Sequence, residues 1–323
     1  MVEMMFLLAD QNKTFWFPEQ ASTFAPEVDW FFLAVTYISL AFFVLIVGFM
    51  VYFMYAYRER PGYKGSPEAL HNNALEIGWT VVPTIVAVWI FYRGTLGFLD
   101  MMTIPADTRD VQVVAKKWAW SFGYPNGVID NELHLVVNEP AKMIMRSDDV
   151  LHSLFVPAFR AKCDVVPGRY ATMWFEPTKT GTYDLFCSEY CGDQHSKMGA
   201  KVVVHTKEEY DTWFTKAQIP PSDPVEYGKL LYAKTMGCAS CHSIDGKKIV
   251  GPSFKGTWGV DVALATGGTV PYDENYVRES VLNPQAKARA GYEKASLMPS
   301  YQGRLKEDQI SALIAYMKSL KSE

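Results

Sequence analysis

The sequence has no excess of charge of one sign, and two long segments carry almost no charge at all. Its 323 residues include 31 Lys and Arg against 35 Asp and Glu, a formal net charge of -4 at pH 7. Because basic residues are not in excess, the composition gives no indication of nucleic-acid binding. Internal repeats and low-complexity tracts are absent as well. The length is sufficient for two or three domains.

The two uncharged segments predict a membrane hairpin over residues 30–102. No Asp, Glu, Lys or Arg occurs in residues 30–57, and the second run, residues 77–92, continues past Arg93 to Leu99. As a helix the first run would be about 42 Å long, more than the ~30 Å hydrocarbon layer. A buried core helix is the alternative for each run, but two in tandem before a polar remainder favour the membrane. Arg93 would lie near one interface, where its side chain can snorkel.

Charged residues beside these runs predict which side each end faces. Arg58, Arg60 and Lys64 lie between the runs, whereas residues 1–29 contain one lysine against five acidic residues. Since membrane-protein loops rich in Lys and Arg stay on the cytoplasmic side, the segment between the runs is expected there. Both chain ends, including the N-terminal segment 1–29, are then expected on the outer side of the membrane. The apolar patch at residues 4–9 lacks preceding basic residues and makes a poor signal peptide, so the first helix is expected to direct insertion.

The remainder is expected to form an all-β domain followed by an all-α domain. Short alternating segments separated by Gly, Pro and Asn fill residues 103–216 and suggest an antiparallel sandwich or barrel, with a closing helix near its end. A proline-rich break then marks a linker, residues 217–225. Helical periodicity dominates the last predicted domain, residues 226–323.

The pentapeptide "CASCH" at residues 238–242 matches the attachment motif of c-type haem. Cys238 and Cys241 would each add to one vinyl group of the porphyrin, and His242 would then ligate the iron. A redox CxxC pair would require a βαβ context, and half of a zinc site would require a second cysteine pair. This segment has neither, so we expect covalent haem.

A second axial ligand is expected from a methionine. Met298 lies before Pro299 in "SLMPSYQG", which resembles the Met-Pro loop of class I cytochromes c. Met236 is too close in sequence to reach the opposite face of the haem, and Met317 lies on the apolar stripe of the last helix. We therefore expect Met298 as the ligand. Ligation by one histidine and one methionine raises the iron potential and favours electron transfer. The stretch "GPSFKG" resembles the loop whose proline supports the proximal histidine in that family.

The dodecapeptide "CSEYCGDQHSKM" at residues 187–198 combines two cysteines, a histidine and a methionine. A disulfide is the alternative, but it would leave the histidine and the methionine unexplained. Thiolate, imidazole and thioether together suit copper. A second histidine is required, and His152, expected at the end of a strand-like run, is the best candidate. His134 and His205 lie in alternating strands and are expected to be structural, while Cys163 is expected to be a free buried thiol.

Several motifs of residues 25–214 resemble subunit II of haem-copper cytochrome c oxidases. The resemblance rests on "LEIGWTVVP", "DDVLHSLFVP", "KCDVVPGR" and the dodecapeptide. Together with the trailing cytochrome, it implies oxidases whose subunit II carries a fused cytochrome c. Such a chain has a two-helix hairpin, a Greek-key cupredoxin domain with a dinuclear copper A centre, and a class I cytochrome c domain. By motif match, the copper ligands would be Cys187 and Cys191 as bridges, with His152, His195, Met198 and the backbone carbonyl of Glu189.

The resemblance also implies roles for three further side chains. The Glu189 carboxylate would point toward a magnesium site shared with subunit I. Trp118 aligns with the tryptophan that admits the electron from cytochrome c, although simple core packing is the alternative. Glu76 matches a glutamate at the mouth of a proton channel, although an acid at a helix start also suits the helix dipole.

The function implied is that of an electron-entry subunit in a proton-translocating terminal oxidase of the bacterial cytoplasmic membrane, with both metal domains on the periplasmic side. Electrons would pass from haem c to copper A and then to subunit I, where oxygen is reduced. The expected partners are subunit I, further oxidase subunits, membrane lipid, and a cytochrome c or a quinol-oxidising complex as donor. A nitrous oxide reductase would need a histidine-rich second copper domain, which the six histidines scattered over this chain cannot supply. A nitric oxide reductase subunit and a stand-alone membrane electron carrier remain alternatives.

Overall fold

The computed structural model describes residues 16–62, 72–293 and 298–321 of the chain. The described residues divide into two compact units, one formed by residues 23–104 and the other by residues 16–22 together with everything from residue 105 onward. The apolar patch at residues 4–9 and Lys64, on which the expected orientation partly rests, lie outside the described residues.

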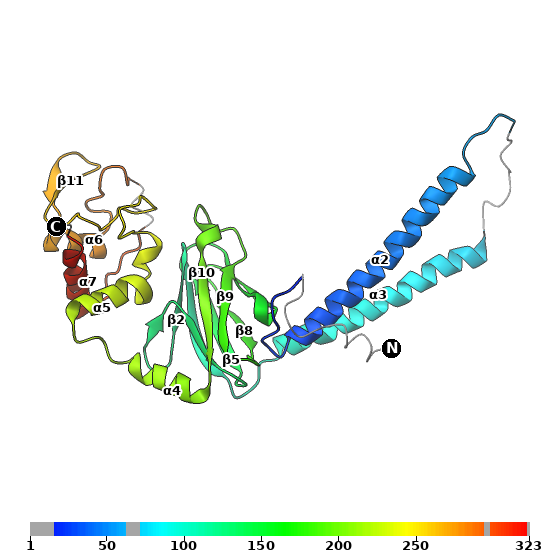
Figure 1. Cartoon of the computed structure of the whole chain (residues 1–323), viewed down its shortest axis with the longest axis horizontal. Helices are drawn as coiled ribbons and strands as arrows, with labels where there is room; N and C mark the ends of the chain where they lie inside the picture. The colour runs from blue at the N-terminus through cyan, green and yellow to red at the C-terminus, as the bar shows by residue number, and fades with distance from the viewer. Residues whose placement is uncertain (1–15, 63–71, 294–297, 322–323) are drawn as a thin grey trace. The chain divides into compact units, whose positions relative to one another are not determined.

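The smaller unit is a pair of long helices, α2 (Ala25–Ala56) and α3 (Asn73–Met102), which lie side by side (Figure 1). Both are long and apolar enough to cross a membrane, and almost none of their residues are buried. Trp30 of α2 and Trp89 of α3 meet edge to face with ring centroids 6.0 Å apart. Arg93 forms an ion pair with Glu27 of the facing helix. These contacts and the exposed apolar surfaces agree with the predicted membrane hairpin.

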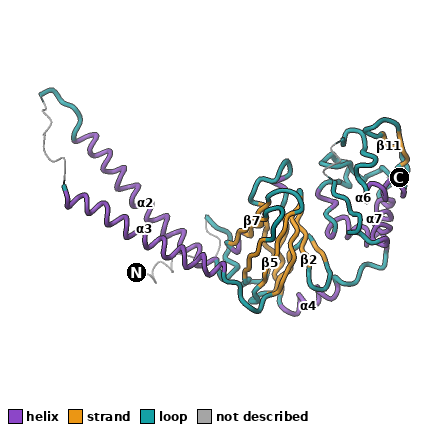
Figure 2. Tube along the Cα trace, turned by 180° about the vertical axis from the view of Figure 1, so that it is seen from behind, coloured by secondary structure: helices purple, strands orange, loops and turns teal. Residues whose placement is uncertain are grey.

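The β-domain is a sandwich of two five-stranded sheets, whose strands lie beside one another in Figure 2. The first sheet has the order β3-β2-β1-β5-β8 and the second β4-β10-β9-β6-β7. The strands of the first sheet are β1 (Arg109–Lys116), β2 (Ala119–Gly123), β3 (Ile129–Asp130), β5 (Ala141–Ser147) and β8 (Ala171–Phe175). Those of the second are β4 (Leu133–Val136), β6 (His152–Val156), β7 (Ala161–Val165), β9 (Gly181–Cys187) and β10 (Gly199–His205).

The sandwich is not wholly antiparallel. Strand β1 pairs with β5 in parallel, and β4 pairs with β10 in parallel. The chain leaves the first sheet after β3 to form β4 in the second, so it returns to β5 running in the same direction as β1. Strict alternation of buried residues along β5 shows that one of its faces packs into the core between the sheets. Helix α4 (Lys207–Lys216) then packs against β4 and β10 at one end.

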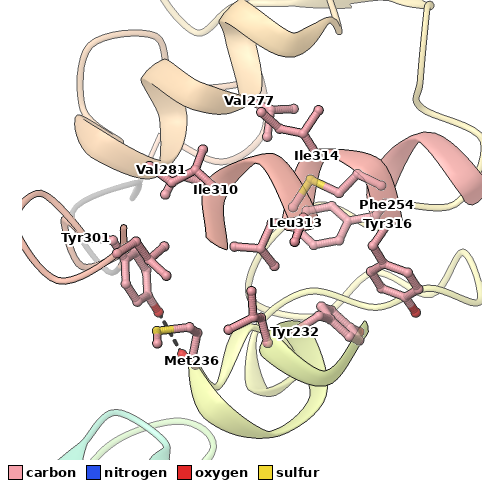
Figure 3. Close-up of a cluster of buried hydrophobic side chains, with 14 of the residues drawn as sticks. Tyr232, Met236, Phe254, Val277, Val281, Tyr301, Ile310, Leu313, Ile314 and Tyr316 are labelled. Atoms are coloured by element: carbon pink, nitrogen blue, oxygen red, sulfur yellow. Dashed lines mark hydrogen bonds between the residues drawn. The ribbon is translucent and has the colours of Figure 1, made fainter. Parts of the chain in front are cut away.

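The last domain is mainly helical, as expected. Its elements are α5 (Pro224–Leu230), the π-helical turn η3 (Leu231–Thr235), the 3-10 turn η4 (Cys238–Ser240), the hairpin β11 (Asp261–Ala263) and β12 (Thr269–Pro271), α6 (Glu274–Leu282) and α7 (Glu307–Ser319). Helices α5 and α7 approach so closely that a Cβ at Gly228 would lie 2.0 Å from the Ala312 carbonyl oxygen. The buried side of α7 contributes Ile310, Leu313 and Ile314 to the core, which Figure 3 shows.

Candidate metal centres

The residues of the dodecapeptide converge with His152 at one end of the second sheet. Cys187 is the last residue of β9, and Met198 directly precedes β10. The Cys187 backbone N–H donates to the Met198 carbonyl, so the loop between them starts and ends on adjacent strands. His152 was expected to end a strand but begins β6, because the preceding residues turn at Ser147, whose hydroxyl donates to the Val150 carbonyl. Register places Leu154, two residues on, opposite Cys187.

Five side chains and one carbonyl form a compact group of potential copper ligands. The two sulfur atoms of Cys187 and Cys191 are 3.8 Å apart. Cys187 Sγ lies 3.8 Å from His152 Nδ1 and 3.3 Å from the Glu189 carbonyl oxygen. Cys191 Sγ lies 3.5 Å from His195 Nδ1 and 3.7 Å from Met198 Sδ. Each cysteine therefore has its own histidine and its own weaker ligand.

His152 is held in the orientation that a metal ligand requires. Its Nε2 lies 2.8 Å from Asp149 Oδ1, so its Nδ1 faces Cys187. A carboxylate that accepts from the distal nitrogen fixes the ring and its tautomer. The Asp149 carboxylate is itself fixed by the backbone N–H groups of Lys117 and Val150. No motif in the sequence identified Asp149 as part of this site.

The two thiols cannot both ionise easily without added positive charge. Burial alone would raise the pKa of Cys187, but the contact with His152 and nearby backbone groups outweigh it and lower that pKa. Burial and then the negative charge of Cys187 raise the pKa of Cys191. Bound cations would remove this penalty, since they stabilise coordinating thiolates.

These residues fit a dinuclear copper centre better than they fit a disulfide. The 3.8 Å between the sulfurs is far longer than a disulfide bond of about 2.05 Å. It is shorter than twice a metal–sulfur bond of about 2.3 Å, so one ion can contact both sulfurs, as can a second on the other side. The thioether and the imidazoles complete a soft donor set suited to copper.

The c-type haem motif lies beside a large cavity. The cavity has a volume of about 590 Å³ and is lined by Cys238, Cys241, His242 and Met298, among others. His242 Nδ1 lies 2.9 Å from the Pro252 carbonyl oxygen, which leaves Nε2 available for a metal. Burial lowers the pKa of His242 and outweighs that hydrogen bond, so the ring is neutral. A Cβ at Gly251 would lie only 2.5 Å from the ring, so this position requires glycine.

Among the three methionines considered as axial ligand, Met298 has the most open surroundings. Met236 is buried beside Tyr301, whose hydroxyl donates to the Met236 carbonyl (Figure 3). Met317 is buried in the same core, 3.9 Å from the Tyr272 hydroxyl. Met298 is partly buried and lines the cavity together with His242. Met317 also lines the cavity, so the assignment of Met298 stays a prediction.

Three other predicted residues have ordinary structural partners. Trp118 is buried in the turn between β1 and β2, and its ring packs against Gly192 of the copper loop. The Glu189 carboxylate accepts from the Lys162 ammonium at 2.9 Å. Glu76 lies in the first turn of α3, where its carboxylate accepts from the Asn72 backbone N–H. Cys163 is a free, partly buried thiol in β7.

Comparisons with known proteins agree with this arrangement. The family model of the cytochrome c oxidase subunit II transmembrane domain matches residues 10–92, that of the subunit II periplasmic domain residues 127–206, and that of cytochrome c residues 225–321. Cytochrome c oxidase subunit 2 of Alkalihalophilus pseudofirmus is 30% identical over 314 residues, which cover 92% of this chain and 89% of the relative. The same subunit of Thermostichus vulcanus is 32% identical and covers 64% of this chain and 80% of the relative.

A solved structure of the periplasmic domain of subunit II of cytochrome oxidase from Bradyrhizobium japonicum is 30% identical and covers 36% of this chain and 97% of its own, with a TM-score of 0.34. The extent of the match to the Alkalihalophilus relative, and the three family models placed in order along the sequence, decide the assignment. The chain belongs to the cytochrome c oxidase subunit II family, with two candidate membrane-spanning helices, a β-sheet cupredoxin-like domain and a C-terminal cytochrome c domain.

Proposed function

We propose that this chain relays electrons from a covalently bound haem c to a dinuclear copper A centre and on to subunit I of a haem-copper oxidase. There, oxygen is reduced to water with coupled proton translocation. The observation that carries the proposal is the convergence of Cys187, Cys191, His152, His195 and Met198 within one chain that also holds the "CASCH" cavity. When bound, haem c and copper A supply metal ions that take up and release single electrons.

The residues at the copper site contribute by keeping the potential ligand atoms in fixed positions. Strands β6, β9 and β10 fix both ends of the ligand loop, and Asp149 orients His152. His152 is fully buried, and Cys191 and Met198 are almost so. A site that changes little when its charge changes suits electron transfer, because few groups need to reorganise. The two cysteines, the histidines and the weaker donors would together complete the coordination of the metal. No coordination position would stay open for a substrate, as one does at a catalytic metal site.

The residues at the haem site would attach the haem, orient its iron ligand and shield that ligand from solvent. Cys238 and Cys241 would form the two thioether bonds, and the Pro252 carbonyl holds the His242 ring with Nε2 toward the cavity. Phe254 stacks on the same ring with centroids 4.6 Å apart. The Tyr232 hydroxyl donates to the His242 carbonyl at 2.6 Å and fixes the backbone at the motif. Burial lowers the pKa of His242 and favours the neutral imidazole that iron ligation needs, while the hydrogen bond to the Pro252 carbonyl fixes the tautomer.

Two contacts of Trp118 support a role for it between the two centres. Its ring lies against Gly192 of the copper loop, and it also lines the cavity that contains Cys238 and Cys241. An aromatic side chain at such a point shortens the gap that an electron must cross through saturated groups. We therefore assign electron passage to Trp118, and we retain the magnesium role of Glu189 and the proton-channel role of Glu76 as parts of the same proposal.

The proposal also assigns a location and partners. The two exposed apolar helices would anchor the chain in the bacterial cytoplasmic membrane. The match of residues 127–206 to a periplasmic domain supports an outer position for the copper domain, and we assign the haem domain to the same side. Subunit I and further oxidase subunits would surround α2 and α3. The donor would be a cytochrome c or a quinol-oxidising complex.

Purification in mild detergent tests the proposal. The chain should co-purify with an oxygen-reducing subunit I and contain two copper ions and one covalent haem. Co-purification with a nitric oxide reductase subunit would contradict the oxidase assignment. A chain that purifies alone with both centres would indicate a stand-alone carrier. One copper ion with a blue-copper spectrum would contradict the dinuclear centre.

A further inference from the structure

A second group of metal-binding side chains lies in the β-domain, on residues that neither copper nor haem uses. Asp130 ends β3, Glu132 lies in the following turn, and His134 is in β4. Potential ligand atoms of the three all lie within 4.8 Å of one another. His134 Nε2 is 3.7 Å from Asp130 Oδ2 and 3.9 Å from Glu132 Oε2. Both distances exceed hydrogen-bonding range.

The buried nitrogen of His134 is the observation that points to a ligand. Only 5% of His134 is exposed, and its Nε2 has no hydrogen-bond partner although it faces the two carboxylates. A buried polar atom left without a partner costs about 1–3 kcal/mol, so such atoms are rare. A metal ion between the nitrogen and the carboxylates would satisfy it. An ordinary carboxylate–histidine hydrogen bond would not leave it nearly 4 Å away.

The surroundings of His134 fix its ring in one position. Trp213 of α4 stacks on the ring with centroids 3.9 Å apart. His134 Nδ1 lies 2.8 Å from His205 Nε2. In the tautomer in which Nδ1–H donates to His205, the lone pair of Nε2 points toward Asp130 and Glu132. A hydrogen bond from the other ring nitrogen commonly orients a metal-binding imidazole, and His205 is its acceptor here.

We propose that Asp130, Glu132 and His134 form a binding site for a divalent transition-metal ion, with zinc as the best match. One imidazole and two carboxylates balance the charge of the ion and form a donor set that zinc accepts. Bonds of about 2.0–2.2 Å in a tetrahedron separate ligand atoms by roughly 3.4 Å. The observed 3.7 and 3.9 Å require only small movements of Glu132, which is partly exposed, and of its neighbours.

A lysine ammonium lies at the same carboxylates. Lys234 Nζ is 2.6 Å from Glu132 Oε2 and 4.0 Å from Asp130 Oδ1. It supplies one positive charge where a metal ion would supply two. Metal binding therefore competes with Lys234, and removing that ammonium should strengthen metal binding. A purely structural cluster predicts the reverse, since Lys234 would then only stabilise it.

The test uses the detergent-purified oxidase complex with its copper centre filled, and zinc chloride as the probe. Zinc binding is measured by calorimetry, and bound zinc is counted after gel filtration. We expect one zinc ion per chain at this site. Glu132→Gln and, separately, His134→Gln should weaken its affinity by roughly 10- to 100-fold. Lys234→Met should strengthen it. Glu208→Gln, which removes the same charge from an exposed position of α4, should leave it unchanged.

X-ray absorption at the zinc edge identifies the ligands. Nitrogen and oxygen neighbours without sulfur support the proposal, whereas sulfur neighbours would place the zinc at cysteines and overturn it. Unchanged affinity in both Glu132→Gln and Lys234→Met would also overturn it. The absorption spectrum of the copper centre should not change on zinc addition, which separates this site from the proposed electron relay.

Discussion

The two candidate metal centres are built in opposite ways. Four of the copper ligands are buried in the folded chain, with His152 0%, Met198 2%, Cys191 3% and Cys187 7% exposed, whereas His195 is partly exposed. Most of them lie on or beside the loop between adjacent strands, and the pairing of these strands does not depend on what the loop binds. The haem-binding residues instead border a cavity of about 590 Å³; Cys238, in the 3-10 turn η4, and Cys241, directly after it, are both partly exposed. The copper site is therefore a feature of the β-sandwich, whereas the cytochrome domain is arranged around its haem.

This difference predicts which centre each domain needs in order to fold. The sandwich has its own core between two sheets, and the copper site lies at one end of it. The cytochrome core, in contrast, is continuous with the cavity wall through Leu313, Met317 and Val281. Losing copper should cost the sandwich little structure. Losing haem should remove a large part of what the cytochrome domain packs against.

The largest expected effect follows from preventing haem attachment with Cys238→Ala and Cys241→Ala together. Without haem, a cavity of about 590 Å³ would leave core residues such as Leu313 and Met317 without the group they pack against. The cytochrome domain should therefore collapse or fill with water. Hydrogen exchange should show lost protection in α5, α6 and α7 and retained protection in β9 and β10. Full protection of all three helices would contradict the claim that the cytochrome domain needs its haem in order to fold.

Removing one bridging thiol should abolish the dinuclear centre and leave the sandwich folded. Cys187→Ser takes away the sulfur with the lowered pKa, which also contacts His152 and the Glu189 carbonyl. Copper per chain, measured by elemental analysis, should fall from two to one or none, with circular dichroism of the sandwich unchanged. Cys163→Ser is the matched control, because that thiol is free and belongs to β7. Two copper ions retained in Cys187→Ser would refute the bridging role.

Replacing the predicted axial methionine tests the haem centre without detaching the haem. In Met298→His, Cys238 and Cys241 still hold the porphyrin, but imidazole favours ferric iron more than a thioether does. The reduction potential should fall by on the order of 100 mV, within the ~0.8 V range set by axial ligands. Redox titration measures it, and Met236→His provides a control at a buried methionine. An unchanged potential would exclude Met298 as ligand.

The smallest effect is expected at the residue that orients His152. Asp149→Asn should weaken copper affinity by roughly 10- to 100-fold, because the amide holds the ring less firmly than the carboxylate does. Copper competition with a chelator measures this. The substitution Asp211→Asn, on exposed α4, removes a similar charge far from the ligands. If both variants bind copper like the unmodified chain, the sheet alone positions His152 and Asp149 has no positioning role.

The sequence predicted the parts of the molecule whose information is local. Period-3.6 apolar residues identified α7, and uncharged runs identified α2 and α3. Fixed spacings predicted the ligand types of both centres, and those assignments stay predictions. Pairings between distant segments were not predictable in this way. The parallel register of β1 with β5 and the contact of Asp149 with His152 depend on how the chain crosses between sheets. His134 was expected to be structural, and its unpartnered nitrogen becomes visible only in three dimensions.

Glycine positions show the same limit. Gly228 lies in no motif of the sequence, and Gly251 was noted only as the first residue of "GPSFKG", although one allows α5 to touch α7 and the other leaves room for the His242 ring. A side chain at either point would collide with a group from another segment. Such requirements arise from packing, so no local pattern signals them.

The central claim is that electrons pass from haem c to copper within this chain. Rapid mixing of the purified complex with a reductant tests this claim most directly. In the intact protein, absorbance should show haem reduction first, then copper reduction, followed by oxygen uptake at an electrode. In Cys187→Ser, the haem should be reduced at the same rate while oxygen uptake stops. Oxygen uptake that persists in Cys187→Ser, or copper that is reduced before the haem, would contradict the account.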